Sequence, residues 1–341
     1  MDQYTPNPDR YDGRMPYRRC GNSGLLLPEL SLGCWHNFGG SVPTQNQMDM
    51  LTTAFDAGIT HFDLANNYGP PYGSAESNVG KLLKQFPRDE LIISSKAGYD
   101  MWPGPYGEWG SRKYLLASLD QSLKRLDLDY VDIFYSHRFD PDTPMEETLG
   151  ALDTAVRQGK ALYAGISSYD SIKTQQAVEI CRDQNFPRIL IHQPNYSMLN
   201  RWVEKSLLNV CKGNGIGVIA FCPLFQGLLT DKYLNGIPEG SRGSLENSPL
   251  RKDELAQQVV DVVRKLNHHA SERGQTLAQM AISWLLKDER VTTVLIGASR
   301  PEQIAENCKA VQNTSFDDEE IQKLDKILAN IDLPPSLWLT E

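Results

Sequence analysis

The sequence lacks several features that would point to other classes of protein. Its 341 residues include six cysteines, with no C-x-x-C pair and no zinc-binding spacing among them. It has no signal peptide and no apolar run of about 18 residues. A net charge of −9 offers no basic patch for nucleic acid or anionic lipid. We therefore expect a cytoplasmic protein with reduced thiols and no membrane or nucleic-acid partner.

Two signatures of bound cofactors are also missing. The six histidines include a single adjacent pair, His268-His269, in a polar predicted helix, so we expect no catalytic metal. The glycine-rich residues 213–217 come before a predicted strand instead of after one, which fails the context test for a Rossmann dinucleotide fingerprint. Binding of a dinucleotide by the loops of another fold is compatible with this absence.

The chain consists largely of alternating predicted strands and helices. Helices are expected between the strands, for example at 45–57, 114–126 and 145–158. Eight β/α units predict one (β/α)8 (TIM) barrel domain over residues 15–341. Residues 1–14 are expected to form a flexible arm, 17–28 a β-hairpin, and the Gly- and Pro-rich residues 222–250 a long functional loop. The strands are expected to start near Leu30, Thr60, Leu91, Tyr130, Ala161, Ile189, Gly217 and Val291.

Polar residues stand where three of these strands end. Asp63 and Tyr68 follow one strand, Lys96 ends the next, and His137 ends the third. Each has an ordinary structural explanation when taken singly, as a turn residue, a solvated cap or a satisfied core histidine. In a (β/α)8 barrel, however, the carboxyl ends of the strands meet at one mouth, and residues there are typical of catalytic sites.

Together the four residues suit the reduction of a carbonyl group, which needs an acid beside the oxygen. Tyr68 is the candidate acid, although a free phenol, with a pKa of about 10, is a weak donor. An ammonium group about 4 Å away would favour the phenolate by roughly 4 kcal/mol, which equals about three pKa units. Lys96 would supply this charge, and Asp63 would keep Lys96 protonated. His137 would orient the substrate oxygen or relay a proton with Tyr68.

These motifs resemble those of the aldo-keto reductases, over nearly the whole chain. The matching segments are Asp63-x-Ala-x-x-Tyr68, Ser95-Lys96 and the residues 132–137 that end in His137. More narrowly, residues 35–38, 66–71 and 98–107 look like those of the bacterial L-glyceraldehyde 3-phosphate reductase group. That group is similar to the β subunits of voltage-gated potassium channels. The resemblance implies a barrel whose hairpin plugs the bottom, and long loops at the C-terminal mouth.

The resemblance also implies a nicotinamide cofactor held along the loops of the barrel. Ser167, Ser168 and Gln193 would bind the carboxamide, and Phe221 would stack on the nicotinamide ring. Lys232 and Arg242 lie in one long loop, and Arg300, next to Ser299, lies in a distant one. These basic residues favour binding of the 2′-phosphate, and therefore NADPH over NADH. The implied cofactor-binding residues are Trp35, Asp63, Ser167, Ser168, Gln193, Phe221, Cys222, Pro223, Leu224, Gln226, Gly227, Lys232, Arg242, Gly297, Ser299, Arg300, Gln303, Glu306 and Asn307.

The expected substrate is a small aldehyde or ketone enclosed by aromatic rings. Trp35, Tyr68, Trp102 and His137 are the candidate contacts, and the group implies L-glyceraldehyde 3-phosphate with methylglyoxal-type aldehydes beside it. Arg112 and Arg138 are the candidates for a substrate phosphate site. Two alternatives stay open: a nucleotide-binding regulatory subunit like the channel β subunits, and a lyase that uses Lys96 as a Schiff-base nucleophile. A homo-oligomer is possible, because relatives range from monomers to rings.

Overall fold

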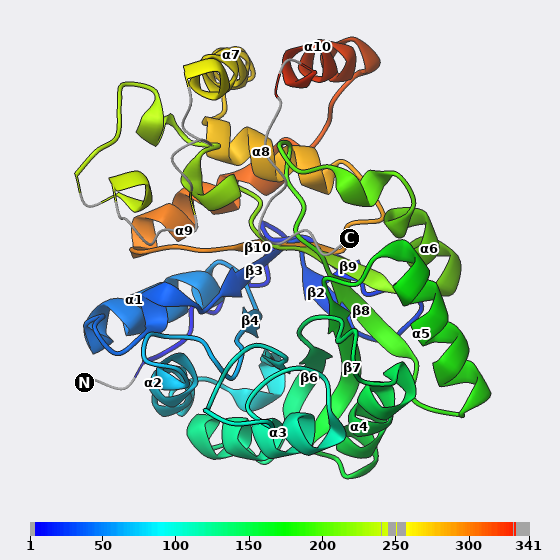
Figure 1. Cartoon of the computed structure of the whole chain (residues 1–341). Coiled ribbons are helices and arrows are strands. Elements are labelled where there is room, and N and C mark those ends of the chain that lie inside the picture. Colours follow the sequence, from blue (N-terminus) through cyan, green and yellow to red (C-terminus); the bar gives the residue numbers. More distant parts are fainter. Residues whose placement is uncertain (1–3, 240, 245–249, 251–256, 330, 332–341) are drawn as a thin grey trace.

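The computed structural model of the chain describes residues 4–239, 241–244, 250, 257–329 and 331, and Figure 1 shows their path. The strands in this part are β1 (Tyr17–Arg19), β2 (Leu26–Pro28), β3 (Leu30–Gly33), β4 (His61–Asp63), β5 (Ile92–Ala97), β6 (Val131–Ser136), β7 (Ala161–Ser167), β8 (Ile189–Gln193), β9 (Gly217–Ala220) and β10 (Thr293–Ile296). The α-helices are α1 (Thr44–Asp56), α2 (Ser74–Leu83), α3 (Arg112–Leu126), α4 (Met145–Arg157), α5 (Ser171–Asp183), α6 (Leu207–Asn214), α7 (Gln257–Glu272), α8 (Leu277–Leu286), α9 (Pro301–Cys308) and α10 (Asp318–Leu328). Short 3₁₀ helices are η1 (His36–Phe38), η2 (Arg88–Glu90), η3 (Trp202–Glu204), η4 (Phe225–Gly227), η5 (Asp231–Tyr233), η6 (Arg242–Ser244) and η8 (Lys309–Gln312).

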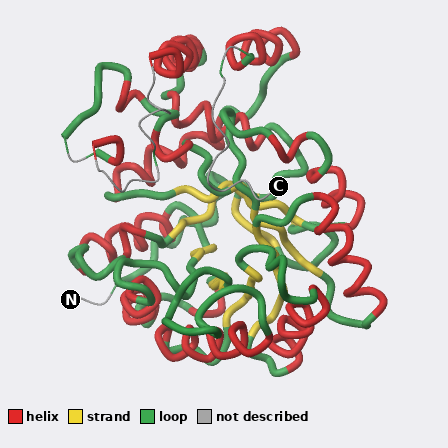
Figure 2. Tube along the Cα trace, in the orientation of Figure 1, coloured by secondary structure: helices red, strands yellow, loops and turns green. Residues whose placement is uncertain are grey.

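Strands β3 to β10 form a closed parallel barrel, and β10 completes it by pairing with both β9 and β3. Figure 2 shows the strands at the centre of the molecule with the helices outside them. This confirms the predicted (β/α)8 fold, and each barrel strand begins within two residues of its predicted start. All the strands end at the same side of the barrel, which places the loops that follow them at one mouth.

The hairpin formed by β1 and β2 closes the opposite end of the barrel. Cys20 and Leu27 are fully buried and pack on side chains inside the barrel, among them Ile133 and Ile219. The turn of the hairpin is fixed near the start of a barrel strand, because the backbone amide of Asn22 donates to the carbonyl oxygen of Gly215, which comes just before β9. The expectation that the hairpin plugs the bottom is confirmed.

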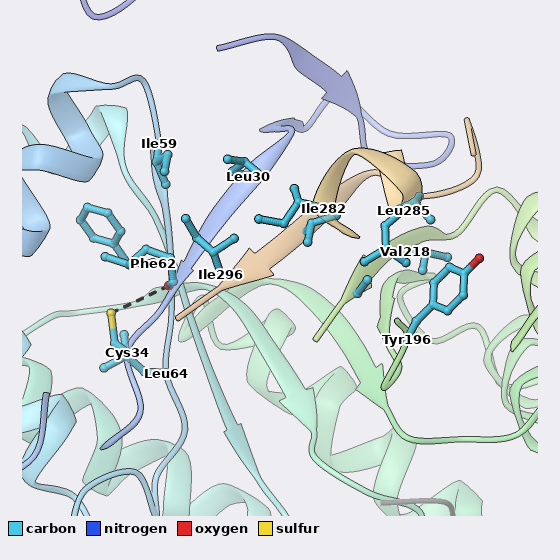
Figure 3. Packing of buried hydrophobic residues seen from close by; sticks show 14 of the residues in the cluster. Leu30, Cys34, Ile59, Phe62, Leu64, Tyr196, Val218, Ile282, Leu285 and Ile296 are labelled. Carbon is cyan, nitrogen blue, oxygen red and sulfur yellow. Dashed lines mark hydrogen bonds between the residues drawn. The ribbon is translucent and has the colours of Figure 1, made fainter. Parts of the chain in front are cut away.

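A second apolar core fills the space between the barrel wall and the helices. Figure 3 shows Leu30 of β3, Ile296 of β10 and Ile282 of α8 in this layer, and all three are fully buried. Side chains cap the start of some of the helices, among them α3, α5, α8 and α10. Ser111 accepts from the amide of Tyr114 at the start of α3, and this satisfies a donor that the helix itself cannot.

Residues 4–14, which we expected to be a flexible arm, make specific contacts with the barrel domain. The hydroxyl of Tyr4 donates to Asp56 at the end of α1, and its ring packs on Phe86 with centroids 5.0 Å apart. Arg10 donates to both carboxylate oxygens of Glu90. Paired charges and buried rings of this kind hold the arm against the surface near α1 and η2.

His192 of β8 makes the stability of the fold depend on pH. It is fully buried, its Nε2 lies 3.0 Å from the carbonyl oxygen of Tyr169, and burial lowers its pKa from 6.5 to about 4. Because the folded-state pKa is depressed, the neutral ring contributes stability above pH 6.5 that is lost as the pH falls toward 4. When the pH is lowered from about 7 to about 4.5, we expect the free energy of unfolding to fall in both proteins. The fall should be about 2 to 3 kcal/mol smaller in His192→Asn than in the wild type, because the variant has no buried imidazole to protonate. Urea denaturation at both pH values measures this, and equal losses in the two proteins would contradict it.

Candidate active site

Asp63 and Lys96 form an ion pair inside the mouth of the barrel. Strands β4 and β5 pair with Asp63 opposite Ser94, so Lys96 lies two residues further along the same face of β5. The Nζ of Lys96 is 2.6 Å from Oδ2 of Asp63 and 2.7 Å from the carbonyl oxygen of Leu64. Neither charged side chain is exposed to solvent. Each charge therefore depends on the other, since removal of one would leave its partner buried without compensation.

Tyr68 reaches this pair from the turn after β4. Its Oη accepts a hydrogen bond from Nζ of Lys96 at 3.3 Å. Its ring stacks on Trp35 with centroids 5.6 Å apart, and the ring of His137 lies edge-on at 6.0 Å. The ring of His137 also lies edge-on to the ring of Tyr99, with centroids 4.7 Å apart. The structure thus brings Asp63, Tyr68, Lys96 and His137 together, as the sequence predicts, and these four residues are called the tetrad below.

Burial sets the protonation states of this group. It lowers the pKa of Lys96, and the carboxylate of Asp63 acts against this shift. Burial also lowers the pKa of His137 well below 6.5, and the charges of Lys96 and Arg138 lower it further. The imidazole is therefore neutral at neutral pH and has one N–H to donate.

The expected effect of Lys96 on the phenol of Tyr68 is not what the structure gives. The pKa of Tyr68 lies well above 10, first because the phenol is buried and then because Asp63 repels a phenolate. The Asp63–Lys96 pair carries no net charge, so little of the lysine's attraction remains to oppose burial. Tyr68 is consequently fully protonated at neutral pH, which a proton donor requires.

A cavity of about 1100 Å³ extends from Asp63, Tyr68 and His137 toward α9. It is lined by every predicted cofactor-binding residue whose side chain the structure describes; the side chain of Arg242 lies outside the described part. Lining residues from the barrel strands and the loop after β9 are Trp35, Asp63, Ser167, Ser168, Gln193, Phe221, Cys222, Pro223, Leu224, Gln226, Gly227 and Lys232. Those from the last β/α unit are Gly297, Ser299, Arg300, Gln303, Glu306 and Asn307.

Internal hydrogen bonds hold many of these groups in place. Ser167 donates to the carbonyl oxygen of Gln193, whose amide Nε2 donates in turn to Oδ1 of Asp63. At the far end, both the amide and the hydroxyl of Ser299 donate to Oε1 of Gln303 in the first turn of α9. The cavity therefore joins the buried ion pair to the start of a helix.

The cavity also contains residues that the sequence did not point out. His36, Asn37 and Asn67 lie near the tetrad, inside segments whose neighbours were singled out. Asn267 and Ser271 of α7, with Gln275 and Thr276 before α8, also line the cavity. No local signal distinguishes polar residues on a helix such as α7 from an ordinary solvated face, so only the fold reveals them.

Three residues that were predicted to contact the substrate are not among the residues that line the cavity. The ring of Trp102 packs on Tyr114 with centroids 5.1 Å apart. Arg112 donates to the carbonyl oxygen of Gly150 in α4. Arg138 donates to a backbone carbonyl and pairs with Glu108. Both guanidinium groups thus have partners within the protein, and neither lines the cavity.

Some other features of the described residues bear on function. No group of three or more His, Cys, Asp or Glu side chains among them is placed to hold a metal ion. None of the helices in that part of the chain is long and apolar enough to span a membrane. The six cysteines, all of which are described, form no disulfide bond.

Comparison with known proteins identifies the family of the chain. Residues 29–329 match the model of the aldo/keto reductase family. The chain is 60% identical over 342 residues to the L-glyceraldehyde 3-phosphate reductase of Escherichia coli K12, with 98% of each chain covered. It is 36% identical over 323 residues to a putative voltage-gated potassium channel subunit beta of Schizosaccharomyces pombe, covering 92% of this chain and 93% of the relative. A probable channel subunit beta of Arabidopsis thaliana is 37% identical over 304 residues, with 87% and 91% covered. The chain therefore belongs to the aldo/keto reductase family and is an oxidoreductase that acts on CH–OH groups.

Proposed function

We propose that this enzyme reduces small aldehydes with NADPH and that Tyr68 is the proton donor. The observation that carries the proposal is the contact of 3.3 Å between the phenol of Tyr68 and the ammonium of Lys96, at the buried end of the cavity. A protonated phenol next to a fixed cation can give up its proton at the moment when the substrate oxygen becomes negative. Oxidation of NADPH by the wild type and by Tyr68→Phe in the presence of L-glyceraldehyde 3-phosphate tests this directly.

Each side chain of the tetrad has a distinct task. Tyr68 donates its proton to the carbonyl oxygen, and Lys96 stabilises the phenolate that forms. Asp63 holds Lys96 in place through the contact of 2.6 Å. His137 is neutral and donates a hydrogen bond that orients the carbonyl group. When bound, the nicotinamide supplies the hydride that reduces the carbonyl carbon.

The cavity fits a phosphorylated dinucleotide. Ser167 and Gln193 provide hydroxyl and amide groups beside Asp63, where a carboxamide would lie. A Cβ added at Gly297 would meet no atom within 4 Å, so the backbone before α9 borders open space. The cations Lys232 and Arg300 line this part of the cavity. These features support binding of the nicotinamide at the barrel mouth and of the phosphates toward α9.

Arg300 should distinguish NADPH from NADH. Its side chain is 65% exposed, and within the described residues its ion pair is with Glu302 at 3.7 Å. A charge-assisted hydrogen bond from Arg300 to the 2′-phosphate would be lost in Arg300→Ala, so we expect the Kd for NADPH to rise about tenfold. The Kd for NADH should stay within about twofold, because NADH has no 2′-phosphate. Titrations that follow protein fluorescence measure both constants, and an equal loss for both cofactors would contradict the assignment.

We propose L-glyceraldehyde 3-phosphate as a substrate, since the chain shares 60% identity and nearly full length with reductases of that name. Methylglyoxal and related aldehydes are proposed as further substrates. The substrate end of the cavity is bordered by the rings of Trp35, Tyr68 and Tyr99, which can exclude water from a short molecule. Reduced cysteines and these small aldehydes suit an enzyme of the cytoplasm.

Two other functions make different predictions. A regulatory subunit, as the channel-type relatives suggest, would bind NADPH tightly and turn over no aldehyde in a panel. A Schiff-base lyase would be trapped covalently on Lys96 by borohydride in the presence of substrate. The Nζ of Lys96 already contacts Asp63, Leu64 and Tyr68 and is fully buried, which leaves it little freedom to attack a carbonyl carbon.

A further inference from the structure

A buried chain of hydrogen bonds leads away from Asp63 into the barrel interior. Oδ1 of Asp63 accepts from the hydroxyl of Ser94 at 2.6 Å, and Oγ of Ser94 lies 3.0 Å from Nε2 of His61. Nδ1 of His61 lies 2.9 Å from Oγ of Ser31, which is 2.8 Å from the hydroxyl of Thr293. All five residues have no solvent exposure.

The carboxylate determines the direction of every bond in this chain. A hydroxyl has one hydrogen, and that of Ser94 is given to Asp63, so Ser94 can only accept from His61. His61 must then carry its proton on Nε2 and accept at Nδ1 from Ser31. Burial lowers the pKa of His61 to about 4, so the ring is neutral and a single tautomer satisfies all its contacts.

We propose that His61, acting through Ser94, is a positioning residue for the reduction: it fixes the carboxylate of Asp63 so that Oδ2 stays on Lys96. The proposal rests on the proposed roles of Lys96 and Tyr68. A carboxylate can rotate about its Cβ–Cγ bond, and the ordered hydroxyl of Ser94 opposes this rotation from the Oδ1 side. A second donor to Oδ1, Nε2 of Gln193, lies at 3.2 Å and is the weaker restraint.

The position of Lys96 connects this chain to the reaction. Its Nζ is shared among Asp63, Leu64 and Tyr68, with the longest contact, 3.3 Å, to the phenol. If Asp63 turns, the ammonium follows it, because the buried charges cannot separate without a large cost. The contact with the phenol is then lost first, and a small displacement of a catalytic group can reduce the rate by about a hundredfold.

Strand β5 offers a matched control for the test. Ser94 and Ser95 are adjacent and both fully buried, and each donates a hydrogen bond of 2.6 Å to a carboxylate. The partner of Ser95 is Glu76 of α2, on the outer face of the barrel wall. Replacement of either serine by alanine removes a buried hydroxyl that donates to a fully buried carboxylate, so the losses of stability should be alike.

The first experiment compares steady-state kinetics of Ser94→Ala and Ser95→Ala with NADPH and L-glyceraldehyde 3-phosphate. For Ser94→Ala we expect kcat to fall at least about tenfold, while KM and the Kd for NADPH stay within about twofold. For Ser95→Ala, kcat, KM and the Kd for NADPH should all stay within about twofold of the wild-type values, although its Tm should be similar to that of Ser94→Ala. The proposal would be overturned if Tyr68→Phe loses turnover while the kcat of Ser94→Ala stays within twofold of that of the wild type.

The second experiment reads the tautomer of His61 by ¹⁵N NMR of the full-length protein, with His61→Asn used to assign the signal. We expect the proton on Nε2 in the wild type and on Nδ1, toward Ser31, in Ser94→Ala. A proton on Nδ1 in the wild type would overturn the proposal. A failure of the proposed function would appear instead as normal turnover by Tyr68→Phe. In that case the tautomer of His61 measured by NMR would still show whether the chain of hydrogen bonds is ordered.

Discussion

Replacement of Tyr68 by phenylalanine is expected to lower kcat for aldehyde reduction by about a thousandfold. The change removes the proton donor and leaves the ring that stacks on Trp35. Lys96 keeps its contacts with Asp63 and Leu64, so the fold and the Kd for NADPH should be nearly unchanged. Single-turnover kinetics with a saturating cofactor measure the chemical step apart from binding.

Tyr169→Phe is the matched control for this variant. Tyr169 is a buried tyrosine whose hydroxyl, like that of Tyr68, is hydrogen-bonded; it lies 2.9 Å from Oγ of Ser136, and Tyr169 does not line the cavity. Its loss should lower stability by about 1 kcal/mol and leave kcat within about twofold. Near-normal turnover by Tyr68→Phe would remove Tyr68 from the acid role.

The variant Lys96→Met should lose both stability and activity. Methionine keeps much of the volume of lysine but leaves the carboxylate of Asp63 buried without its cation, which costs about 3 to 5 kcal/mol. Turnover should fall about a thousandfold or more, because no charge remains to stabilise the phenolate of Tyr68. Chemical denaturation and steady-state kinetics test the two effects separately.

A double variant separates the structural role of Lys96 from its chemical one. In Asp63→Asn/Lys96→Met no charge is left unpaired, and asparagine can still accept the hydrogen bond from Ser94. We expect most of the lost stability to return while the activity does not. Recovery of turnover together with stability would show that Lys96 acts only on the fold.

Much of the fold could be predicted because hydrophobic periodicity determines it. Strands such as β6 and helices such as α4 begin within a residue or two of their expected positions. The tetrad followed from the same logic, since the carboxyl ends of parallel strands meet at one mouth. Contacts of residues 4–14 were missed because they depend on single long-range pairs, such as Arg10 with Glu90, that leave no periodic pattern.

The protonation states of the site could not be predicted from the sequence. A lysine near a tyrosine suggested a lowered pKa for the phenol, whereas burial and the neutralising carboxylate give a raised one. The chain from Asp63 through Ser94 to His61 was also not visible, because Ser94 of β5 joins two residues of β4 that lie about 30 residues earlier in the sequence. These groups become neighbours only when β4 and β5 pair.

The most direct measurement of the central claim is the oxidation of NADPH by the wild-type enzyme and by Tyr68→Phe, followed by absorbance with L-glyceraldehyde 3-phosphate or methylglyoxal. We expect aldehyde-dependent oxidation of NADPH by the wild type, slower oxidation with NADH, and almost none by Tyr68→Phe. Tight NADPH binding without oxidation by the wild type, or equal rates for the two proteins, would contradict it.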